Sequence, residues 1–295
     1  MGFGRGRATG DSRVTGVLVL VATPIGNLGD LTPRAIKELA DADVVCCEDT
    51  RRTGMLLQHA GIRARRLLRV DEHTEFVATE SLLDALGSGQ RVVLVSDAGT
   101  PGISDPGERL VAAVAAAGHV ITSVPGPVAA VAALVTSGLS TRRFVFEGFL
   151  ARKGRERDVQ LGEIAMQPRT VVLYESPKRT AATLEALARA CGGDRQAVVA
   201  RELTKLHEEI ARGTLDELVT WAKDGLKGEV VIVVAGAPAP ADSTDDDLIG
   251  ALEHALAAGE SRRDAVDRVA AQTGARRGRI YDLALSIPKG VTPSS

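Results

Sequence analysis

The sequence of 295 residues is poor in cysteine and has no long apolar run, and both features exclude whole classes of protein. Its three cysteines include the adjacent pair Cys46 and Cys47, whereas zinc sites use spaced pairs of ligands. We therefore expect Cys46 and Cys47 to pack in a core, Cys191 to stand alone and the chain to occupy a reducing compartment. No run approaches the roughly 18–20 apolar residues that span a membrane, so we expect no membrane association.

Targeting signals and a strong net charge are also missing. The opening stretch "MGFGRGRATGDSRVTG" has no apolar core of the kind found in signal peptides. We expect a flexible tail over residues 1–15 and a cytoplasmic protein. The formal net charge of −2 argues against a protein that coats nucleic acid by bulk charge, although local basic clusters remain available for it.

Motifs for phosphate binding, ester hydrolysis and zinc catalysis are absent. The sequence has neither a Walker loop nor a Gly-x-Gly-x-x-Gly turn between a strand and a helix. "GISDPG" is not a nucleophile elbow, and "HEEIA" lacks the second histidine of a zinc protease helix. We expect no metal site. The glycine-rich loops instead bring bare main-chain N–H and C=O groups close to a neutral or zwitterionic ligand.

Short apolar runs alternate with amphipathic stretches over most of the chain, and these runs predict eight strands. The predicted strands are 17–23, 43–48, 91–96, 119–124, 144–149, 170–175, 197–202 and 229–235. Alternation of strand and helix predicts an α/β architecture with largely parallel sheets. Continuous apolar character indicates strands that are covered on both faces.

Turn-rich and proline-rich stretches divide the chain. "TSGLSTRRF" (136–144) predicts a boundary between an N-terminal α/β domain, 16–140, and a second α/β domain, 141–236. "GAPAPADSTDDDL" predicts a linker over 237–247, and we interpret its acidic run as solvated. Three short helices are predicted beyond the linker, and they form a small helical module over 248–295.

The loop after the strand 91–96 is the most unusual stretch of the sequence. In α/β sheets ligands bind outside the carboxyl ends of the strands, and Asp97 lies at such an end. Further along, Asp105 and Glu108 have the spacing of a capping box. We therefore interpret Asp105 as a helix cap, and we expect Asp97 to matter more to a ligand than Asp105 does.

Seven segments resemble the signature segments of the ribosomal RNA small subunit methyltransferase I family, which belongs to the tetrapyrrole methylases. They are "VATPIGNLGDLTPRA", "EDTRRT", "LVSDAGTPGISDPG", "PGPVAA", "FEGFLARKG", "YESPKR" and "ARELTKLHEE". The resemblance spans about residues 16–236, and the terminal helical module also looks like the family's. One departure is "LRVDEHTE" (68–75), where the family typically has an aromatic residue and a histidine, so we assign no role to His73.

This resemblance implies a fold, a reaction and partners. The fold would have two α/β domains of the tetrapyrrole-methylase type, with S-adenosylmethionine in the cleft between them. The reaction would transfer a methyl group to the ribose 2′-oxygen of a cytidine in the decoding centre of 16S rRNA. The substrate would be 16S rRNA within the small ribosomal subunit, and the protein would be a homodimer.

Matched to the family's motifs, eight residues are implied as neighbours of the cofactor. They are Pro24, Asp97, Thr100, Ile103, Val128, Ala129, Tyr174 and Leu203. Val128 replaces a commoner small polar residue, which removes a side-chain hydrogen bond. Packing in the core is the open alternative for Ile103, Val128 and Ala129. For Tyr174 the alternative is packing against the neighbouring strand, and for Pro24 it is shaping of a turn.

Methyl transfer needs alignment above all, and a base near the ribose oxygen would accelerate it. The catalytic candidates at the cleft are Glu48, Asp49, Glu202 and Lys205, with Glu175 as a further carboxylate. The candidates for holding RNA phosphates are Arg51, Arg52, Arg152, Lys153, Arg155, Arg157 and Arg201. A mutual ion pair is the open alternative for Glu48 and Arg51. The basic stretch 262–279 predicts a second, remote contact with RNA.

Two other functions stay open. One is a tetrapyrrole or other small-molecule methyltransferase of the same fold, although such enzymes usually carry a Gly-Pro-Gly-Asp turn where this chain has "TPIGN". The other is a non-enzymatic nucleic-acid-binding protein that uses the terminal helices. That interpretation leaves the residues at the strand ends unexplained.

Overall fold

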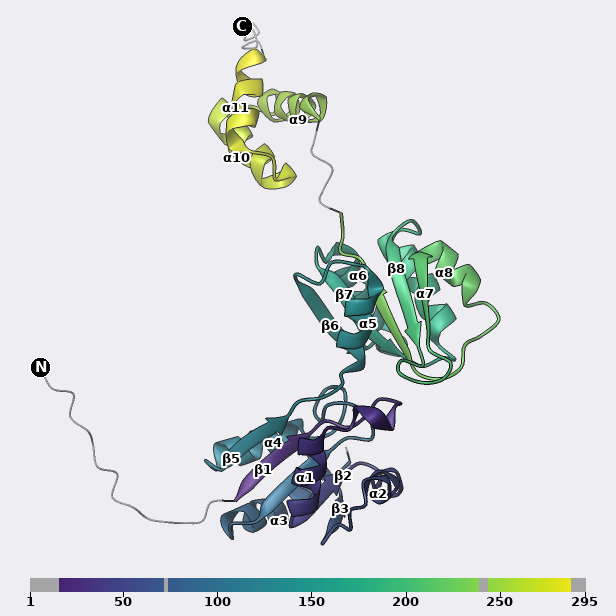
Figure 1. The fold of residues 1–295 in the computed structure, drawn as a ribbon. Coiled ribbons are helices and arrows are strands. Elements are labelled where there is room, and N and C mark those ends of the chain that lie inside the picture. Colours follow the sequence, from purple (N-terminus) through teal and green to yellow (C-terminus); the bar gives the residue numbers. More distant parts are fainter. Residues whose placement is uncertain (1–15, 72–73, 239–243, 288–295) are drawn as a thin grey trace, which may run out of the picture. The chain divides into compact units, whose positions relative to one another are not determined.

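The structure is a computed structural model (Figure 1). It describes residues 16–71, 74–238 and 244–287. The chain divides into two compact units, residues 1–236 and residues 237–295, and each is described by itself. No helix within the described ranges is both long and apolar enough to cross a membrane.

Parts of the sequence predictions fall outside the described residues. They concern the tail 1–15, His73, the linker residues 239–243 and the end of the helical module, 288–295.

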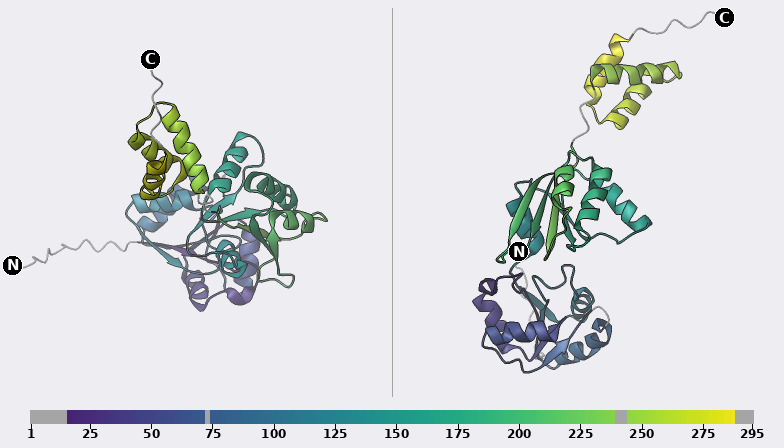
Figure 2. Two further views of the ribbon diagram at one scale, coloured as in Figure 1. Left: turned by 90° about the horizontal axis from the view of Figure 1, so that it is seen from above. Right: turned by 90° about the vertical axis from the view of Figure 1, so that its right-hand side faces the viewer.

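The first sheet, coloured from purple to teal in Figures 1 and 2, is parallel throughout, with the strand order β3-β2-β4-β1-β5. Its strands are β1 (Val17–Val21), β2 (Val44–Cys47), β3 (Leu67–Arg69), β4 (Arg91–Val95) and β5 (Val120–Val124). Its helices are η1 (Leu28–Asp30), α1 (Pro33–Asp41), α2 (Thr50–His59), α3 (Glu75–Gly87) and α4 (Glu108–Ala116). α1 and α2 cover one face of the sheet, and α3 and α4 cover the other.

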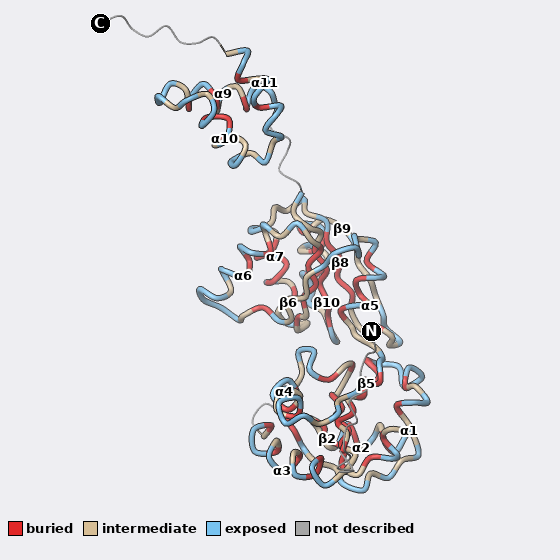
Figure 3. The backbone as a smooth tube through the Cα atoms, turned by 90° about the vertical axis from the view of Figure 1, so that its left-hand side faces the viewer, coloured by how far each residue is buried: buried red, intermediate tan, exposed pale blue. Residues whose placement is uncertain are grey.

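Burial on both faces explains why β4 is apolar along its length. It also explains the adjacent cysteines. Side chains alternate across a strand, so Cys46 packs in one core of the sheet and Cys47 packs in the opposite core. Their predicted role in core packing is confirmed, and all three cysteines are free. Figure 3 shows the buried strands of both sheets in red.

The second sheet is mixed, so the prediction of largely parallel sheets is wrong for this half. Its strands are β6 (Phe144–Phe149), β7 (Thr170–Glu175), β8 (Gln196–Arg201), β9 (Glu209–Thr214) and β10 (Val230–Val234), in the order β6-β7-β10-β8-β9. β6 and β7 are parallel, whereas β10 runs antiparallel to both β7 and β8. β9 follows the loop 202–208 and pairs antiparallel with β8. The sequence analysis did not predict β9, because the strand is partly exposed and partly polar and so lacks a continuous apolar run.

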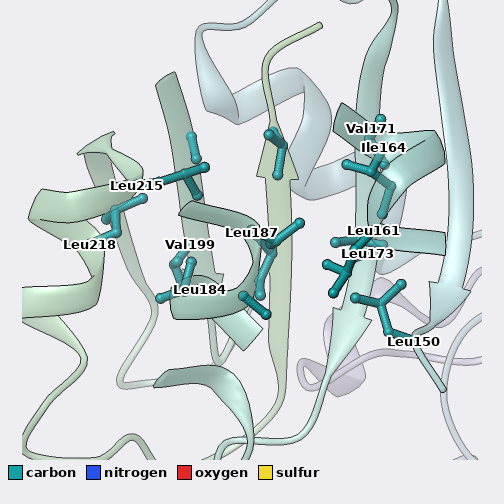
Figure 4. Packing of buried hydrophobic residues seen from close by; sticks show 14 of the residues in the cluster. Leu150, Leu161, Ile164, Val171, Leu173, Leu184, Leu187, Val199, Leu215 and Leu218 are labelled. Atoms are coloured by element: carbon teal, nitrogen blue, oxygen red, sulfur yellow. The ribbon is translucent and has the colours of Figure 1, made fainter. Parts of the chain in front are cut away.

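Helices cover the second sheet on both faces. α6 (Arg155–Met166), α7 (Thr180–Cys191) and α8 (Leu215–Trp221) pack on one face through a leucine-rich core (Figure 4). α5 (Ala129–Ser137) packs on the other face, although it follows β5 of the first sheet. The crossing between the sheets therefore lies at residues 125–128, before the predicted boundary at 140.

The second unit contains the three helices that the sequence predicts. They are α9 (Asp245–Ala257), α10 (Arg262–Thr273) and α11 (Arg277–Ser286). α9 begins three residues before the predicted start of the module, because Thr244 caps it by accepting a hydrogen bond from Asp247 N at 3.2 Å. The acidic run is therefore the first turn of a helix, where negative charge is favourable, rather than a solvated linker.

Helix α4 begins at Glu108 with Gly107 as its N-cap, so the prediction that Asp105 caps this helix is wrong. Gly107 has φ +128°, and an added Cβ would lie 2.7 Å from Leu94 Cδ2, so glycine is required there. The amide of Leu110 donates instead to Glu75 Oε1 at 2.9 Å. Glu75, only 5% exposed, caps α4 from the neighbouring helix α3.

We expect Glu75→Ala to lower the free energy of unfolding by about 1–3 kcal/mol, because it leaves a buried amide of α4 without its acceptor. The measurement is urea denaturation. Glu80→Ala is the matched control, since Glu80 is an exposed glutamate of the same helix. Equal unfolding midpoints for the two variants would contradict this account of the cap.

Candidate active site

Three loops at the carboxyl ends of the first sheet are joined by hydrogen bonds. Thr23 N donates to Gly99 O at 2.8 Å, and Gly99 N donates to Thr23 O at 3.1 Å. This pair joins the loop after β1 to the loop after β4. Thr100 Oγ1 donates to Pro127 O at 3.2 Å, which adds the loop before α5. Together these loops form one rim from segments far apart in the sequence.

A pocket of about 360 Å³ lies against this rim, within the size range of small-molecule sites. Its lining comes from both sheets of the first unit. Six of the eight residues implied as cofactor neighbours line it, namely Thr100, Ile103, Val128, Ala129, Tyr174 and Leu203. Ile25 and Asp105 also line it, and neither belongs to the predicted set.

The other two residues of that set lie outside the pocket lining. Pro24 is buried between Thr23 and Ile25. The carboxylate of Asp97 accepts a hydrogen bond from Asp49 N at 3.1 Å and lies 3.5 Å from Arg52 Nη1. Asp97 therefore braces the start of α2 against the end of β4.

Tyr174 connects the two halves of the pocket. Its hydroxyl accepts a hydrogen bond from Ala130 N at 3.2 Å, which satisfies one of the first amides of α5. Its ring packs edge-on against Phe146 and Phe149, at centroid distances of 4.9 and 5.7 Å. Burial raises the pKa of Tyr174, so this hydroxyl stays protonated at neutral pH.

Asp105 is the group that the sequence interpretation missed. It is half-buried in the pocket wall, and burial together with the charge of Glu48 raises its pKa from 3.8 to about 6. A hydrogen bond with Ser96 acts in the opposite direction. The available signal in the sequence was the pair of glycines that flank Asp105, Gly102 and Gly107, because glycine favours the positive φ that both adopt.

The four predicted catalytic candidates have different surroundings. Asp49 is the N-cap of α2, and the hydrogen bond that it accepts from Arg51 N at 2.8 Å lowers its pKa. Burial and the neighbouring Asp97 raise the pKa of Glu48. Among the described residues Glu48 forms no ion pair with Arg51. Neither Glu48 nor Asp49 lines the pocket.

Glu202 and Lys205 neutralise one another. Lys205 Nζ donates to Glu202 Oε1 at 2.7 Å and to Glu229 Oε2 at 2.8 Å. The bond to Lys205 lowers the pKa of Glu202. Burial alone would lower the pKa of Lys205, but its two carboxylate partners outweigh that effect and raise it. Both shifts make these side chains less suited to accept a proton at neutral pH, because Glu202 becomes a weaker base and Lys205 stays protonated.

The predicted RNA-binding cations fall into two groups. Arg201 pairs with Glu209 at 2.6 Å, and Arg157 donates to Ala151 O at 3.0 Å and to Thr183 Oγ1 at 3.1 Å. The side chains of these two arginines are therefore engaged by partners within the protein. The exposed cations are Arg51, Arg52, Arg152, Lys153 and Arg155. Within the described part of the chain, no hydrogen bond or ion pair engages the side chains of Arg152, Lys153 or Arg155.

Three of the six arginines in the basic stretch 262–279 of the helical module form ion pairs. Arg268 pairs with Glu260 at 3.3 Å, and Arg277 pairs with Asp267 at 2.5 Å. Arg279 also pairs, with an aspartate in the first turn of α9. As for metals, the described residues include no group of three or more His, Cys, Asp or Glu side chains that could hold an ion.

Comparison with known proteins gives consistent matches. The family model Tetrapyrrole (Corrin/Porphyrin) Methylases matches residues 17–219. A ribosomal RNA small subunit methyltransferase I from Synechocystis sp. is 46% identical over 276 residues, which cover 92% of this chain and 98% of the relative. The protein of the same name from Mycobacterium tuberculosis is 47% identical over 273 residues, covering 92% and 95%.

Solved structures share the fold at lower identity. The methyltransferase CobJ matches with a TM-score of 0.58 at 22% identity, covering 76% of this chain and 95% of that one. A uroporphyrin-III C-methyltransferase from Thermus thermophilus, complexed with S-adenyl homocysteine, matches with a TM-score of 0.55 at 21% identity, covering 74% and 96%. These matches support the tetrapyrrole-methylase fold that the sequence motifs predict.

We expect Asp105→Asn to stabilise the protein, and to do so more at pH 8 than at pH 4. A carboxyl whose pKa is raised on folding contributes stability below about pH 3.8, and that contribution is lost as the pH rises through about 6. Removing the charge should therefore raise the free energy of unfolding by roughly 1–3 kcal/mol above pH 7 and by little near pH 4. Denaturation of both proteins across this range measures it, and a gain independent of pH would refute the assigned cause.

Proposed function

The chain belongs to the ribosomal RNA small subunit methyltransferase I family of the tetrapyrrole methylases, and from that premise we propose that it is an S-adenosylmethionine-dependent 16S rRNA methyltransferase. The position that it modifies is the ribose 2′-oxygen of a cytidine in the decoding centre. One observation carries this proposal, namely identity of 40–47% with the rRNA methyltransferases along 92% of the chain. The solved uroporphyrin-III and cobalt precorrin-4 methyltransferases and CobJ, which share the fold, reach only 18–23% identity, so a small-molecule substrate is the weaker alternative.

The pocket has the chemistry that S-adenosylmethionine requires. Ile25, Ile103, Val128 and Leu203 provide apolar walls for a flat ring system. The first amides of α5 lack intrahelical partners, and Val128 and Ala129 bring that helix start to the pocket, where it suits a carboxylate. These residues would hold the cofactor with little help from charged side chains.

When bound, S-adenosylmethionine supplies an electrophilic methyl group on its sulfonium. The protein aligns the ribose oxygen with that group and removes the hydroxyl proton. Asp105 is the best-placed proton acceptor, because it lines the pocket and is deprotonated near neutral pH while remaining a stronger base than an ordinary aspartate. The ribose oxygen would receive the methyl group that the bound cofactor supplies, and the Asp105 carboxylate would accept the hydroxyl proton.

The remaining parts of the proposal concern partners. The exposed cations Arg51, Arg52, Arg152, Lys153 and Arg155 would contact phosphates of 16S rRNA in the small ribosomal subunit. We further propose that the protein acts as a homodimer in the cytoplasm, as the family resemblance implies.

We expect Asp105→Asn to lower kcat for methylation of small ribosomal subunits by about 10²- to 10⁴-fold, the usual contribution of a general base. The affinity for S-adenosylmethionine, measured by calorimetry, should change little. In the parent protein the rate should rise as the pH passes through about 6, and in the variant this rise should disappear. Glu108→Gln is the control, since Glu108 is an exposed acid three residues away. A parent-like pH profile for Asp105→Asn would remove Asp105 from the mechanism.

We expect replacement of Arg152, Lys153 and Arg155 together by serine to weaken binding to the small subunit and to flatten its dependence on salt. Each phosphate that a cation neutralises releases counterions, so the dependence of affinity on salt becomes shallower when fewer phosphates are bound. Titration at several salt concentrations measures this slope. Arg157→Ser should instead destabilise the fold, because Arg157 holds Ala151 and Thr183. An unchanged slope in the triple variant would show that these cations only solvate the surface.

A further inference from the structure

A second hollow lies beside the pocket, at the ends of β6 and β7. It shares Phe149, Glu175 and Ser176 with the pocket, so the two cavities are adjacent. Residues 150–152 and Arg179 complete its lining. Because β6 and β7 are parallel neighbours, these residues meet at one edge of the second sheet.

One side of this hollow is fixed by a buried ionic network. Arg179 Nη2 donates to Leu150 O at 3.0 Å and lies 3.3 Å from Glu175 Oε2. Glu175 is only 3% exposed, and its carboxylate also accepts a hydrogen bond from Thr183 Oγ1 at 2.7 Å. The carboxylate of Glu175 is therefore paired within the protein, and we assign it a structural role rather than a role in ligand binding.

The loop that follows β6 is fixed as firmly. Ala151 N donates to Gln160 Oε1 at 2.9 Å, and Ala151 O accepts from Arg157 Nη1 at 3.0 Å. Both partners belong to α6. The backbone on either side of the hollow is therefore preorganised between Phe149 and Arg152.

Phe149 and Arg152 are the side chains that this frame leaves exposed. The ring of Phe149 is 53% exposed although it lines two cavities, and its edge contact with Tyr174 fixes its tilt. Arg152 is exposed, and no hydrogen bond or ion pair among the described residues uses its guanidinium. An open aromatic face with a free cation beside it matches a ligand that has a flat ring and an anionic group.

We propose that this hollow receives the target nucleotide of the RNA, with its base stacked on Phe149 and a neighbouring phosphate held by Arg152. The inference deepens the proposed function and rests on it. Enzymes that do chemistry on a base extrude its nucleotide into a pocket, and a target nucleotide held out of its helix in the same way can be fixed by stacking its base on an aromatic side chain. Phe149 and Asp105 both line the first pocket, so a base on Phe149 brings its ribose toward the proton acceptor.

The first test measures methyl transfer from S-adenosylmethionine to small ribosomal subunits from cells that lack this protein. Phe149→Leu should lower kcat/KM for the subunits about tenfold, and Phe149→Trp should restore it. Phe144→Leu is the matched control, because Phe144 is 42% exposed at the opposite end of the same strand. The affinity for S-adenosylmethionine should stay within about twofold in every variant, and the thermal midpoint should stay close to that of the parent.

The second test does not depend on activity. A decoding-centre RNA hairpin carries pyrrolocytidine, whose fluorescence falls when the base stacks, at the target cytidine. The parent protein and Phe149→Trp should quench this fluorescence, Phe149→Leu should not, and Arg152→Ala should weaken binding with the quenching retained at saturation.

The outcomes separate this inference from the proposed function. Loss of S-adenosylmethionine affinity in Phe149→Leu would assign the ring to the cofactor and overturn the inference. So would equal behaviour of Phe149→Leu and Phe144→Leu in an otherwise active enzyme. If the parent fails to methylate subunits but quenches pyrrolocytidine through Phe149, the nucleotide site stands and the proposed function fails.

Discussion

The pair of main-chain hydrogen bonds between Thr23 and Gly99 is the constraint on which the rest of the site depends. It joins two loops that follow adjacent parallel strands, β1 and β4, and Gly99 adopts φ +86° there, a conformation that favours glycine. The Thr23 hydroxyl strengthens the junction by donating to Ser96 O at 3.2 Å. Since the rim is fixed by main chain, the pocket keeps its shape without charged side chains and can accept a zwitterionic ligand.

The second constraint is the path of α5. This helix leaves the first sheet and packs on the second through Ala133 and Leu134, so one element fixes the position of both walls of the pocket. Tyr174 completes the connection by accepting a hydrogen bond from the start of the helix. The edge contact between the rings of Tyr174 and Phe149 then positions Phe149, which lines the second hollow.

Much of the fold can be predicted from the sequence, because central strands buried on both faces carry continuous apolar runs. The edge strands β3 and β9 escape prediction, since they are short or partly polar. The direction of β10 also escapes it, because strand direction depends on the path of distant segments rather than on local pattern. The site is predictable only where its residues lie in motifs, as Thr100 and Ile103 do in the glycine-rich loop that lines the pocket. The assignment of Asp105 as a cap failed because Glu75, which lies far upstream on α3, caps α4 instead. A cap supplied by a residue distant in the sequence cannot be recognised from the local pattern of a single sequence.

Mapping of ribose methylation in 16S rRNA tests the central claim most directly. The rRNA would be taken from cells that lack this protein and from the same cells after the gene is restored. The account predicts one decoding-centre cytidine whose 2′-O-methyl group is missing in the first sample and returns in the second. Identical methylation in both samples, or a loss confined to a base carbon or nitrogen, would contradict it.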